Sequence, residues 1–445
     1  MAFLRQMVLA FSMASLMVLA MPLSLAAQTT PAAKPPAQSQ AAPPAPGQQA
    51  YTLPPGKLAK AIALSRIRNI LDIAGSIWGI VFLWLLLATG AWAAIERWAE
   101  RRSVRRWVQG AGFFCVFFLL SALASLPLDL AGNHYERAYG ISVQGWPGWF
   151  GDLGKALGLT LVFGTAILLL FNWIVRRWPR RYWLVAWSVT IPILLLVMFV
   201  EPVLIEPLFD SFQPLAHPNP VLVEQLEKVV ARTGTAIPPS RMFLMKASAK
   251  TNGLNAYVSG IGATKRIVVW DTTAGRIPND EILFIFGHET GHYVLHHIWK
   301  GLAGTIAGLF FVYWACAALA AWMVRRFGPA WSVTDLSSRT GFVVLLFVVS
   351  IAGFLLEPVS NAFSRHFEHQ ADVYGQEAIH GIVSDPQKTA VAAFNDLGRA
   401  WLEEPNPNPF IEFWLYSHPS TEQRANFAAH YDPWKNGGHG KYFAK

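Results

Sequence analysis

The stretch GLAGTIAGLFFVYWACAALAAWMV, residues 301–324, carries no charged side chain at all. A helix needs about 20 mostly apolar residues to cross a bilayer, and a buried helix of a soluble protein rarely runs this long without a charge. Five other stretches have the same apolar character, roughly at 73–95, 111–128, 157–175, 183–200 and 341–356. The sequence therefore predicts a mostly α, polytopic membrane protein embedded in a lipid bilayer.

The composition of the whole chain agrees with a membrane protein. Of its 445 residues, 53% are hydrophobic and 14% are charged, whereas soluble proteins carry about 25% charged residues. The net charge is +9, but the arginines stand in short runs beside apolar segments. We interpret them as topology signals and expect no nucleic-acid partner. Cys115 and Cys316 each lie inside an apolar segment, which argues against a disulfide framework.

The N-terminal segment, residues 1–26, has Arg5, an apolar run over 7–21 and then the residues SLAAQ. This pattern is typical of a secretory signal peptide cleaved after Ala26 or Ala27, and the alternative is an uncleaved first membrane helix. Residues 27–56 are rich in Pro, Ala and Gln, so we expect a disordered linker.

The distribution of basic residues predicts the orientation in the membrane, because short loops rich in Lys and Arg stay in the cytoplasm. Five arginines lie in 96–110, four in the loop RRWPRR at 176–181, and two follow the fifth span at 325–326. Counting spans puts all three loops on one side. Residues 201–300 and everything after 357 then face away from the cytoplasm.

Residues 207–300 are too polar for the membrane and are expected to form a small α+β region. The spacing in 221–234 is helical, and 241–273 is typical of two or three short strands with Gly-rich turns. The residues Pro278, Asn279 and Asp280 then start a helix that we expect to continue to about 298.

This last helix contains FGHETGHYVLHH, residues 286–297. His288 and His292 are four apart and share one helix face, where two imidazoles can bind one zinc ion. Glu289 lies between them and can reach a water molecule on such a metal. This H-E-x-x-H arrangement predicts a metalloprotease helix with two ligands and a general base. The alternative is a set of interfacial histidines at the level of the lipid headgroups.

A catalytic zinc ion needs a third protein ligand, and NAFSRHFEHQADVYG, residues 361–375, offers one. Glu368 and Asp372 are four apart on one helix face. Glu368 is the candidate ligand, and Asp372 can hydrogen-bond a ligand histidine. The alternative for this segment is a solvated acidic face. His366 and His369 compete for the metal, but they point elsewhere on the helix if Glu368 points inward.

These motifs together resemble the type I CaaX prenyl proteases, integral-membrane zinc metalloproteases of the gluzincin kind. The resemblance runs from about residue 60 to the end of the chain. It rests on HETGHYVLHH with its further histidine His297, on NAFSRHFEHQAD, and on three more segments: EPVLIEPLFDSFQPL (201–215), NAYVSGIGATKRIVVWDT (255–272) and NPNPFIEFWLYSHPSTEQR (405–424).

The resemblance implies a role for individual residues. One zinc ion per chain would be bound by His288, His292 and Glu368, with Glu289 as the base. Asp372 would support the site or donate a proton, and His418 would stabilise the oxyanion of the tetrahedral intermediate. The strand 265–270 would offer its edge to an extended substrate, through Val268, Val269 and Trp270. Asn255 and Arg424 would make lesser contacts, and the alternative for both is a structural role.

The resemblance also implies seven membrane helices around a large chamber, which the six spans and residues 7–21 would supply. The Pro-rich linker and the outward-facing catalytic side depart from the family pattern. The signal-like N-terminus, the linker and the composition suggest a bacterial inner-membrane protein. We expect N-terminal membrane helices over 57–206, a zinc-protease region over 207–300, a helix pair over 301–360 and a C-terminal catalytic region over 361–445.

The leading functional hypothesis is a membrane-embedded zinc metalloendopeptidase that cuts membrane-associated peptides or proteins without an obligate protein partner. One alternative is a heat-shock-type quality-control membrane protease, which usually has fewer spans. A second is a non-proteolytic membrane chaperone or chamber with a structural zinc ion, although such a protein has no use for a base at Glu289.

Overall fold

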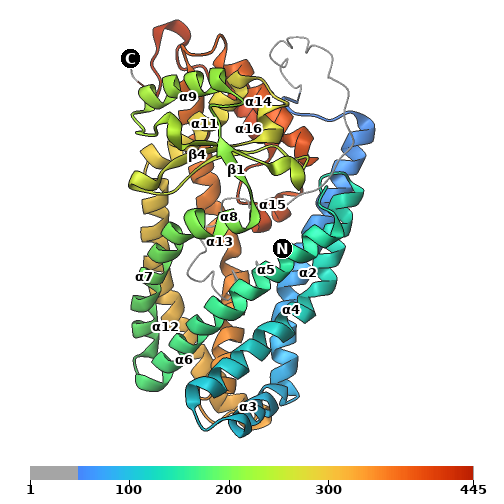
Figure 1. Cartoon of the computed structure of the whole chain (residues 1–445), viewed down its shortest axis with the longest axis vertical. Coiled ribbons are helices and arrows are strands. Elements are labelled where there is room, and N and C mark those ends of the chain that lie inside the picture. The colour runs from blue at the N-terminus through green and yellow to red at the C-terminus, as the bar shows by residue number, and fades with distance from the viewer. Residues whose placement is uncertain (1–48, 444–445) are drawn as a thin grey trace.

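The structure, a computed structural model, describes residues 49–443 and is mostly helical (Figure 1). Within these residues, six helical segments are long and apolar enough to cross a membrane: Pro55–Ala88, Arg106–Ala138, Trp146–Arg177, Tyr182–Phe209, His297–Trp331 and Arg339–Ile379. The predicted fold class is confirmed. The predicted signal peptide or first membrane helix at 1–26 lies outside the described residues.

The membrane helices extend beyond the predicted apolar spans, and the first is displaced. Helix α2 (Pro55–Ala88) ends ahead of Gly90, whose φ of 71° is the left-handed conformation that glycine adopts readily. The separate helix α3 (Ala91–Arg102) follows, so the predicted end of the first span at residue 95 is wrong. The other helices of this part are α4 (Arg106–Ala138), α5 (Trp146–Leu159), α6 (Thr165–Arg177), α7 (Tyr182–Val200) and α8 (Glu206–Phe209).

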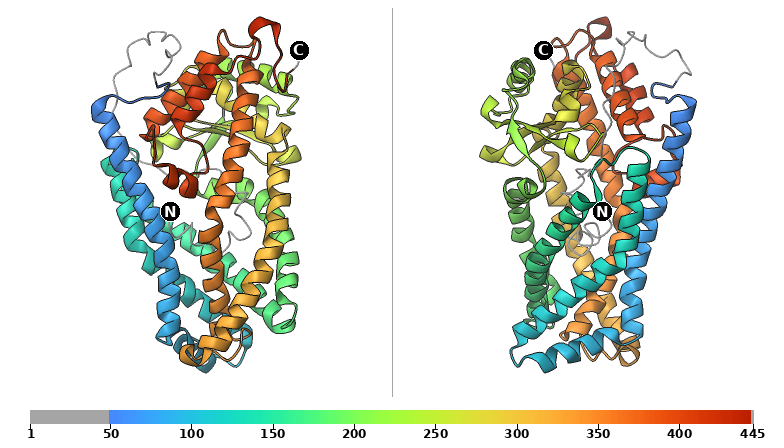
Figure 2. Two further views of the ribbon diagram at one scale, coloured as in Figure 1. Left: turned by 180° about the vertical axis from the view of Figure 1, so that it is seen from behind. Right: turned by 45° about the vertical axis from the view of Figure 1, so that its right-hand side comes forward.

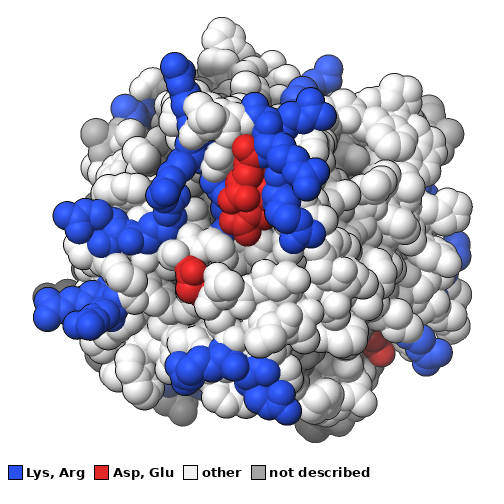
Figure 3. Space-filling view, turned by 90° about the horizontal axis from the view of Figure 1, so that it is seen from below, with Lys and Arg blue, Asp and Glu red and all other residues white. Residues whose placement is uncertain are grey.

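The membrane helices converge at the end that carries α3 and spread apart towards the end that carries the β-sheet (Figures 1 and 2). The converging end bears many Lys and Arg side chains around a smaller acidic patch (Figure 3). Glu96 of α3 accepts hydrogen bonds there from the backbone N–H groups of Arg339 and Thr340, at 2.8 and 2.9 Å. These bonds tie α3 to the first residues of another membrane helix.

A four-stranded sheet lies at the opposite end of the molecule, in the order β1-β2-β4-β3. Its strands are β1 (Phe212–Pro214), β2 (Met242–Met245), β3 (Ala256–Ser259) and β4 (Arg266–Trp270). Strand β4 pairs in parallel with β2 and antiparallel with β3. The prediction that the strand at 265–270 offers its edge is therefore wrong: both of its sides are paired, and β3 is the outer strand next to it.

The rest of the polar part consists of helices that precede or follow the strands in the sequence. Ahead of the strands β2 to β4 lies α9 (Pro220–Thr233), close to the predicted 221–234. After them come α10 (Asp271–Ala274), α11 (Asn279–Val294), α14 (Pro386–Trp401), α15 (Pro409–Leu415) and α16 (Thr421–His430).

The helix predicted to continue to 298 is broken instead. Helix α11 ends at Val294, and α12 (His297–Trp331) starts anew after His296, whose φ is 59°. In contrast, the sixth span and the segment with the predicted third ligand are one continuous helix, α13 (Arg339–Ile379). One 41-residue helix thus runs from the basic end of the molecule into the polar part.

The N-terminal segment is anchored at the sheet end. Tyr51 and Leu53 are buried, and the backbone N–H groups of Ala50 and Tyr51 donate to the carboxylate of Glu422 on α16. The Tyr51 hydroxyl also donates to the carbonyl of Glu403 at 2.9 Å. The expected disordered linker at 27–56 is therefore wrong for its last residues, while 27–48 lie outside the described part of the chain.

Helices α11 and α13 cross where each contributes a glycine, Gly287 and Gly375. A Cβ atom on Gly375 would lie 2.7 Å from the backbone nitrogen of His288, and one on Gly287 would lie 3.0 Å from the carbonyl oxygen of Gly375. Backbone atoms cannot give way as a flexible side chain can. The two glycines therefore permit an approach that would be closed to any other residue.

We predict that Gly375→Ala destabilises the protein. The added methyl group meets backbone atoms of α11, and overpacking of this kind costs about 1–3 kcal/mol. Thermal unfolding of the purified protein in detergent should therefore occur at a clearly lower temperature. Gly308→Ala on α12 is the matched control, because a Cβ atom added at Gly308 would meet nothing within 4 Å. Equal unfolding temperatures for Gly375→Ala and the unaltered chain would contradict this reading of the crossing.

Candidate metal centre

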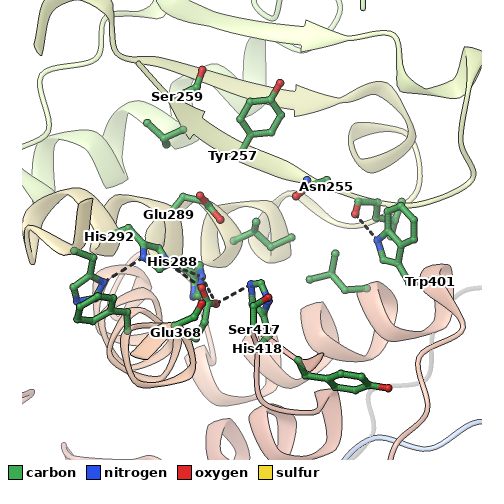
Figure 4. A pocket seen from close by; sticks show the side chains of 18 of the residues that line it. Asn255, Tyr257, Ser259, His288, Glu289, His292, Glu368, Trp401, Ser417 and His418 are labelled. Carbon is green, nitrogen blue, oxygen red and sulfur yellow. Dashed lines mark hydrogen bonds and ion pairs between the residues drawn. The ribbon is translucent and has the colours of Figure 1, made fainter. Parts of the chain in front are cut away.

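The crossing of α11 and α13 brings three predicted ligands together. His288 and His292 come from consecutive turns of α11, and Glu368 comes from α13 (Figure 4). One ligand atom from each lies within 4.8 Å of the other two. The Nε2 atoms of the histidines are 3.2 Å apart, and the Glu368 oxygens lie 3.3 Å from His288 Nε2 and 3.5 Å from His292 Nε2.

The donor set fits a divalent metal ion. Two imidazole nitrogens and one carboxylate are the ligands of many catalytic zinc sites. Glu368 Oε2 is buried, and the nearest nitrogens lie 3.3–3.5 Å away without completing a hydrogen bond: His288 Nε2, His418 Nε2 and Arg424 Nη2. A buried carboxylate oxygen without a well-formed hydrogen bond is costly, and a metal ion at this point would satisfy it.

Asp372 lies one turn beyond Glu368 and holds His288 from behind. Its Oδ1 is 2.8 Å from His288 Nδ1, and Arg424 of α16 donates to both of its oxygens, at 2.6 and 2.9 Å. A carboxylate at Nδ1 keeps the proton on that nitrogen. The lone pair of His288 Nε2 is then free to face Glu368 and a metal ion.

Glu289 lies beside His288 on α11, and its carboxylate is on the side that faces strand β3, near Asn255 and Tyr257 (Figure 4). Its carboxylate lies near the backbone N–H of Val258 in this strand. Burial raises the pKa of the Glu289 carboxyl to about 7, although His288 and the Val258 N–H act in the opposite direction. A carboxyl group with such a pKa can exchange a proton near neutral pH.

His418 reaches the same centre from the loop between α15 and α16. Its Nε2 is 3.3 Å from Glu368 Oε2, and its Nδ1 is 2.9 Å from the Ser417 hydroxyl oxygen. Burial lowers the pKa of His418, against the pull of Glu368. A neutral imidazole that accepts from Ser417 at Nδ1 carries its proton on Nε2, facing the metal centre.

The residues expected to contact a substrate divide into two groups. Asn255 lines the cavity in front of Glu289, as does Trp270 with its 3% exposure. Val268 and Val269 are fully buried inside the sheet and do not line it. The sequence reasoning missed Tyr257 and Ser259 of β3, which do line it. Alternation of side chains along AYVS was the available signal, but it does not show which strand is outermost.

The centre opens into a cavity of about 770 Å³. Its wall is shared between the polar part and the membrane helices. Ser65, Asn69 and Asp72 line it from α2, and Leu194 and Met198 line it from α7. A molecule in this cavity would contact the metal centre and the membrane helices together.

Comparison with known proteins adds to this geometry. A family model described as "Peptidase family M48" matches residues 216–432, and one described as "CAAX prenyl protease N-terminal, five membrane helices" matches residues 37–211. The metalloprotease YhfN of Bacillus subtilis is 34% identical over 376 residues, which cover 84% of this chain and 86% of YhfN.

Eukaryotic proteins are similar as well. CAAX prenyl protease 1 of Saccharomyces cerevisiae is 27% identical over 340 residues, covering 70% of each chain. The crystal structure of S. mikatae Ste24p has the same fold, with a TM-score of 0.73, 22% identity and 95% coverage of both chains. The resemblance to the CaaX prenyl proteases is thus confirmed. The chain belongs to peptidase family M48 and is an integral-membrane metallopeptidase.

Proposed function

We propose that this chain is a zinc-dependent endopeptidase that hydrolyses peptide bonds of membrane-associated proteins inside its cavity. The observation that carries the proposal is the convergence of His288 Nε2, His292 Nε2 and the Glu368 carboxylate within 4.8 Å. These residues would hold one zinc ion. When bound, zinc polarises a substrate carbonyl and lowers the pKa of a water molecule towards about 7.

The surrounding residues have separate tasks in this proposal. Glu289 accepts the proton of the attacking water and passes it to the leaving amine, a role that suits its pKa of about 7. His418 donates from Nε2 to the oxyanion of the tetrahedral intermediate. Asp372, paired with Arg424, keeps His288 in the tautomer that leaves Nε2 free. Asp372 is thus a supporting residue, because it touches His288 and no reacting atom.

Strand β3 is the candidate binding edge for an extended substrate. It is the outer strand, and Asn255, Tyr257, Val258 and Ser259 line the cavity opposite Glu289. A substrate strand beside β3 would pass its peptide bonds between that edge and the α11 histidines, a β-augmentation mode. This assignment replaces the predicted contacts of Val268 and Val269.

The two alternative functions are less well supported. A heat-shock-type membrane protease would have fewer spans, whereas residues 49–443 alone contain six candidate spans and the prenyl protease N-terminal model matches. A chaperone with a structural zinc ion would not need a carboxylate next to a ligand histidine and lining the cavity.

We expect Glu289→Gln to keep zinc and lose catalysis. The amide cannot accept a proton, and removing a general base costs about 10²–10⁴-fold in rate. Purified wild-type protein and variant should each contain one zinc ion, with cleavage of an unstructured protein only in the wild type. Asp280→Asn, on the first turn of the same helix, serves as the control and should remain active. Undiminished cleavage by Glu289→Gln, or a wild type without zinc, would refute the proposed mechanism.

His418→Phe should lower kcat by about 10²–10³-fold, the usual loss for one oxyanion donor. The ring is retained but cannot donate a hydrogen bond, so zinc content should not change. The matched control is His430→Phe, since His430 lies outside the cavity and bonds to the carbonyl of Asn426. If kcat of His418→Phe equals that of the control, His418 is only a loop residue.

We infer that the catalytic end lies outside the cytoplasm of a bacterial inner membrane. The support is that the three basic loops lie at the α3 end, opposite the sheet, and that basic loops remain cytoplasmic (Figures 1 and 3). Alkaline phosphatase fused after Lys445, which is active only after export, should therefore be active. A fusion to a protein that fluoresces only in the cytoplasm should stay dark, and the reverse result would invert the topology.

A further inference from the structure

A row of polar side chains extends from His292 on the side away from Glu368. His292 Nδ1 is 3.2 Å from His297 Nδ1, His297 Nε2 is 2.9 Å from Gln370 Oε1, and Gln370 Nε2 is 2.8 Å from His366 Nε2. The row begins at a predicted metal ligand and ends at an exposed histidine. The catalytic proposal uses none of its last three members.

The break between α11 and α12 places His297 in this row. In a continuous helix, residues five apart point about 140° away from each other, so His297 could not face His292. The chain instead turns through His296, with a φ of 59° that costs energy for a residue other than glycine. His297 is then the first residue of α12, and the centroid of its ring lies 5.1 Å from that of the His292 ring.

The ring of His297 is held on its other sides too. It is only 3% exposed. It stacks on the Phe367 ring with a centroid distance of 4.5 Å and an angle of 15° between the planes. Phe367 and Gln370 both belong to α13, the helix that carries Glu368. Helix α13, which supplies the proposed ligand Glu368, thus also holds His297, the residue that contacts the proposed ligand His292.

The hydrogen bonds in the row can run in only one direction when His292 Nε2 faces a metal ion. The proton of neutral His292 must then be on Nδ1. His297 accepts it at Nδ1 and so carries its own proton on Nε2, which donates to the Gln370 carbonyl oxygen. The Gln370 amide donates in turn to His366. Each donor in the row meets an acceptor, and no charge is needed.

We propose that His297, Gln370 and His366 form a positioning relay for the metal centre. The relay fixes the tautomer and the ring orientation of His292, and thereby sets the affinity for zinc. It rests on the proposed zinc site and adds residues outside the ligand set. His288 is positioned by the ion pair of Asp372 and Arg424, whereas His292 is positioned by a chain of neutral groups.

The test compares two replacements of His297. His297→Phe keeps a ring that can stack on Phe367 but removes the acceptor, whereas His297→Asn places an oxygen near the former Nδ1. We expect the zinc Kd of His297→Phe, measured against a chromophoric chelator at one pH, to rise about 10–100-fold. His297→Asn should recover most of that loss. The visible spectrum of the Co²⁺-loaded protein should shift in His297→Phe and return towards wild type in His297→Asn.

The control is His369→Phe, because His369 is an exposed histidine of α13 that contacts Phe427 and lies outside the row. Its zinc Kd and Co²⁺ spectrum should match wild type. Gln370→Leu removes the acceptor of the His297 Nε2 proton but leaves the His297 side chain itself unchanged. This variant should also have a higher zinc Kd than wild type. If His297→Phe does not unfold in a cooperative thermal transition, the zinc Kd of Gln370→Leu decides the test.

Three outcomes would overturn the relay: an unchanged Kd in both His297→Phe and Gln370→Leu, an equal loss in His297→Phe and His297→Asn, or an equal loss in His369→Phe. Failure of the zinc site itself has a different signature. In that case wild type would bind no zinc, or Glu368→Ala would bind it as tightly as wild type.

Discussion

The close crossing of α11 and α13 is the constraint on which the site depends. Gly375 lets the backbone of α13 approach the backbone nitrogen of His288, where even a methyl group would lie at 2.7 Å. At that separation Glu368 and Asp372 reach opposite nitrogens of the same imidazole, at 3.3 and 2.8 Å. A wider crossing would move both carboxylates away together. The glycines therefore set the geometry of the metal centre, although they carry no functional group.

The same crossing connects the site to the membrane part. Helix α13 is continuous from Arg339 at the basic end to Ile379 in the polar part, and Glu96 holds its first turn through two backbone N–H groups. The position of Glu368 along the cavity is thus set through one continuous helix. The other wall depends on β3, which is tied to α11 by the Tyr293 hydroxyl. This hydroxyl lies 3.3 Å from the carbonyl oxygen of Val258 in β3 and 2.9 Å from that of Gly260 just after the strand.

Local patterns allowed the sequence to predict the spans, the α11 motif and the candidate ligands, because hydropathy and the four-residue spacing of His288 and His292 depend on the nearby chain alone. Strand order does not depend on the nearby chain alone. Strand β4 is interior because it pairs with β2, which lies more than twenty residues earlier in the sequence, and no feature of RIVVW shows this pairing. The break at His296 was missed for a related reason. A left-handed histidine has no local signal, and tertiary contacts of His297 must stabilise it. The buried Tyr51 likewise depends on Glu422, far along the chain.

The residues around the proposed zinc site add little negative charge to it beyond that of Glu368. The one carboxylate in the proposed ligand set, Glu368, would leave a divalent ion with a net positive charge. Asp372 does not cancel that charge, because Arg424 pairs with both of its oxygens. The support behind His292 consists of neutral groups, so it adds no negative charge either. A centre that remains positive attracts an oxyanion more strongly in a low-dielectric cavity. An anionic residue in place of His297 or Gln370 would still orient His292, but it would weaken that attraction.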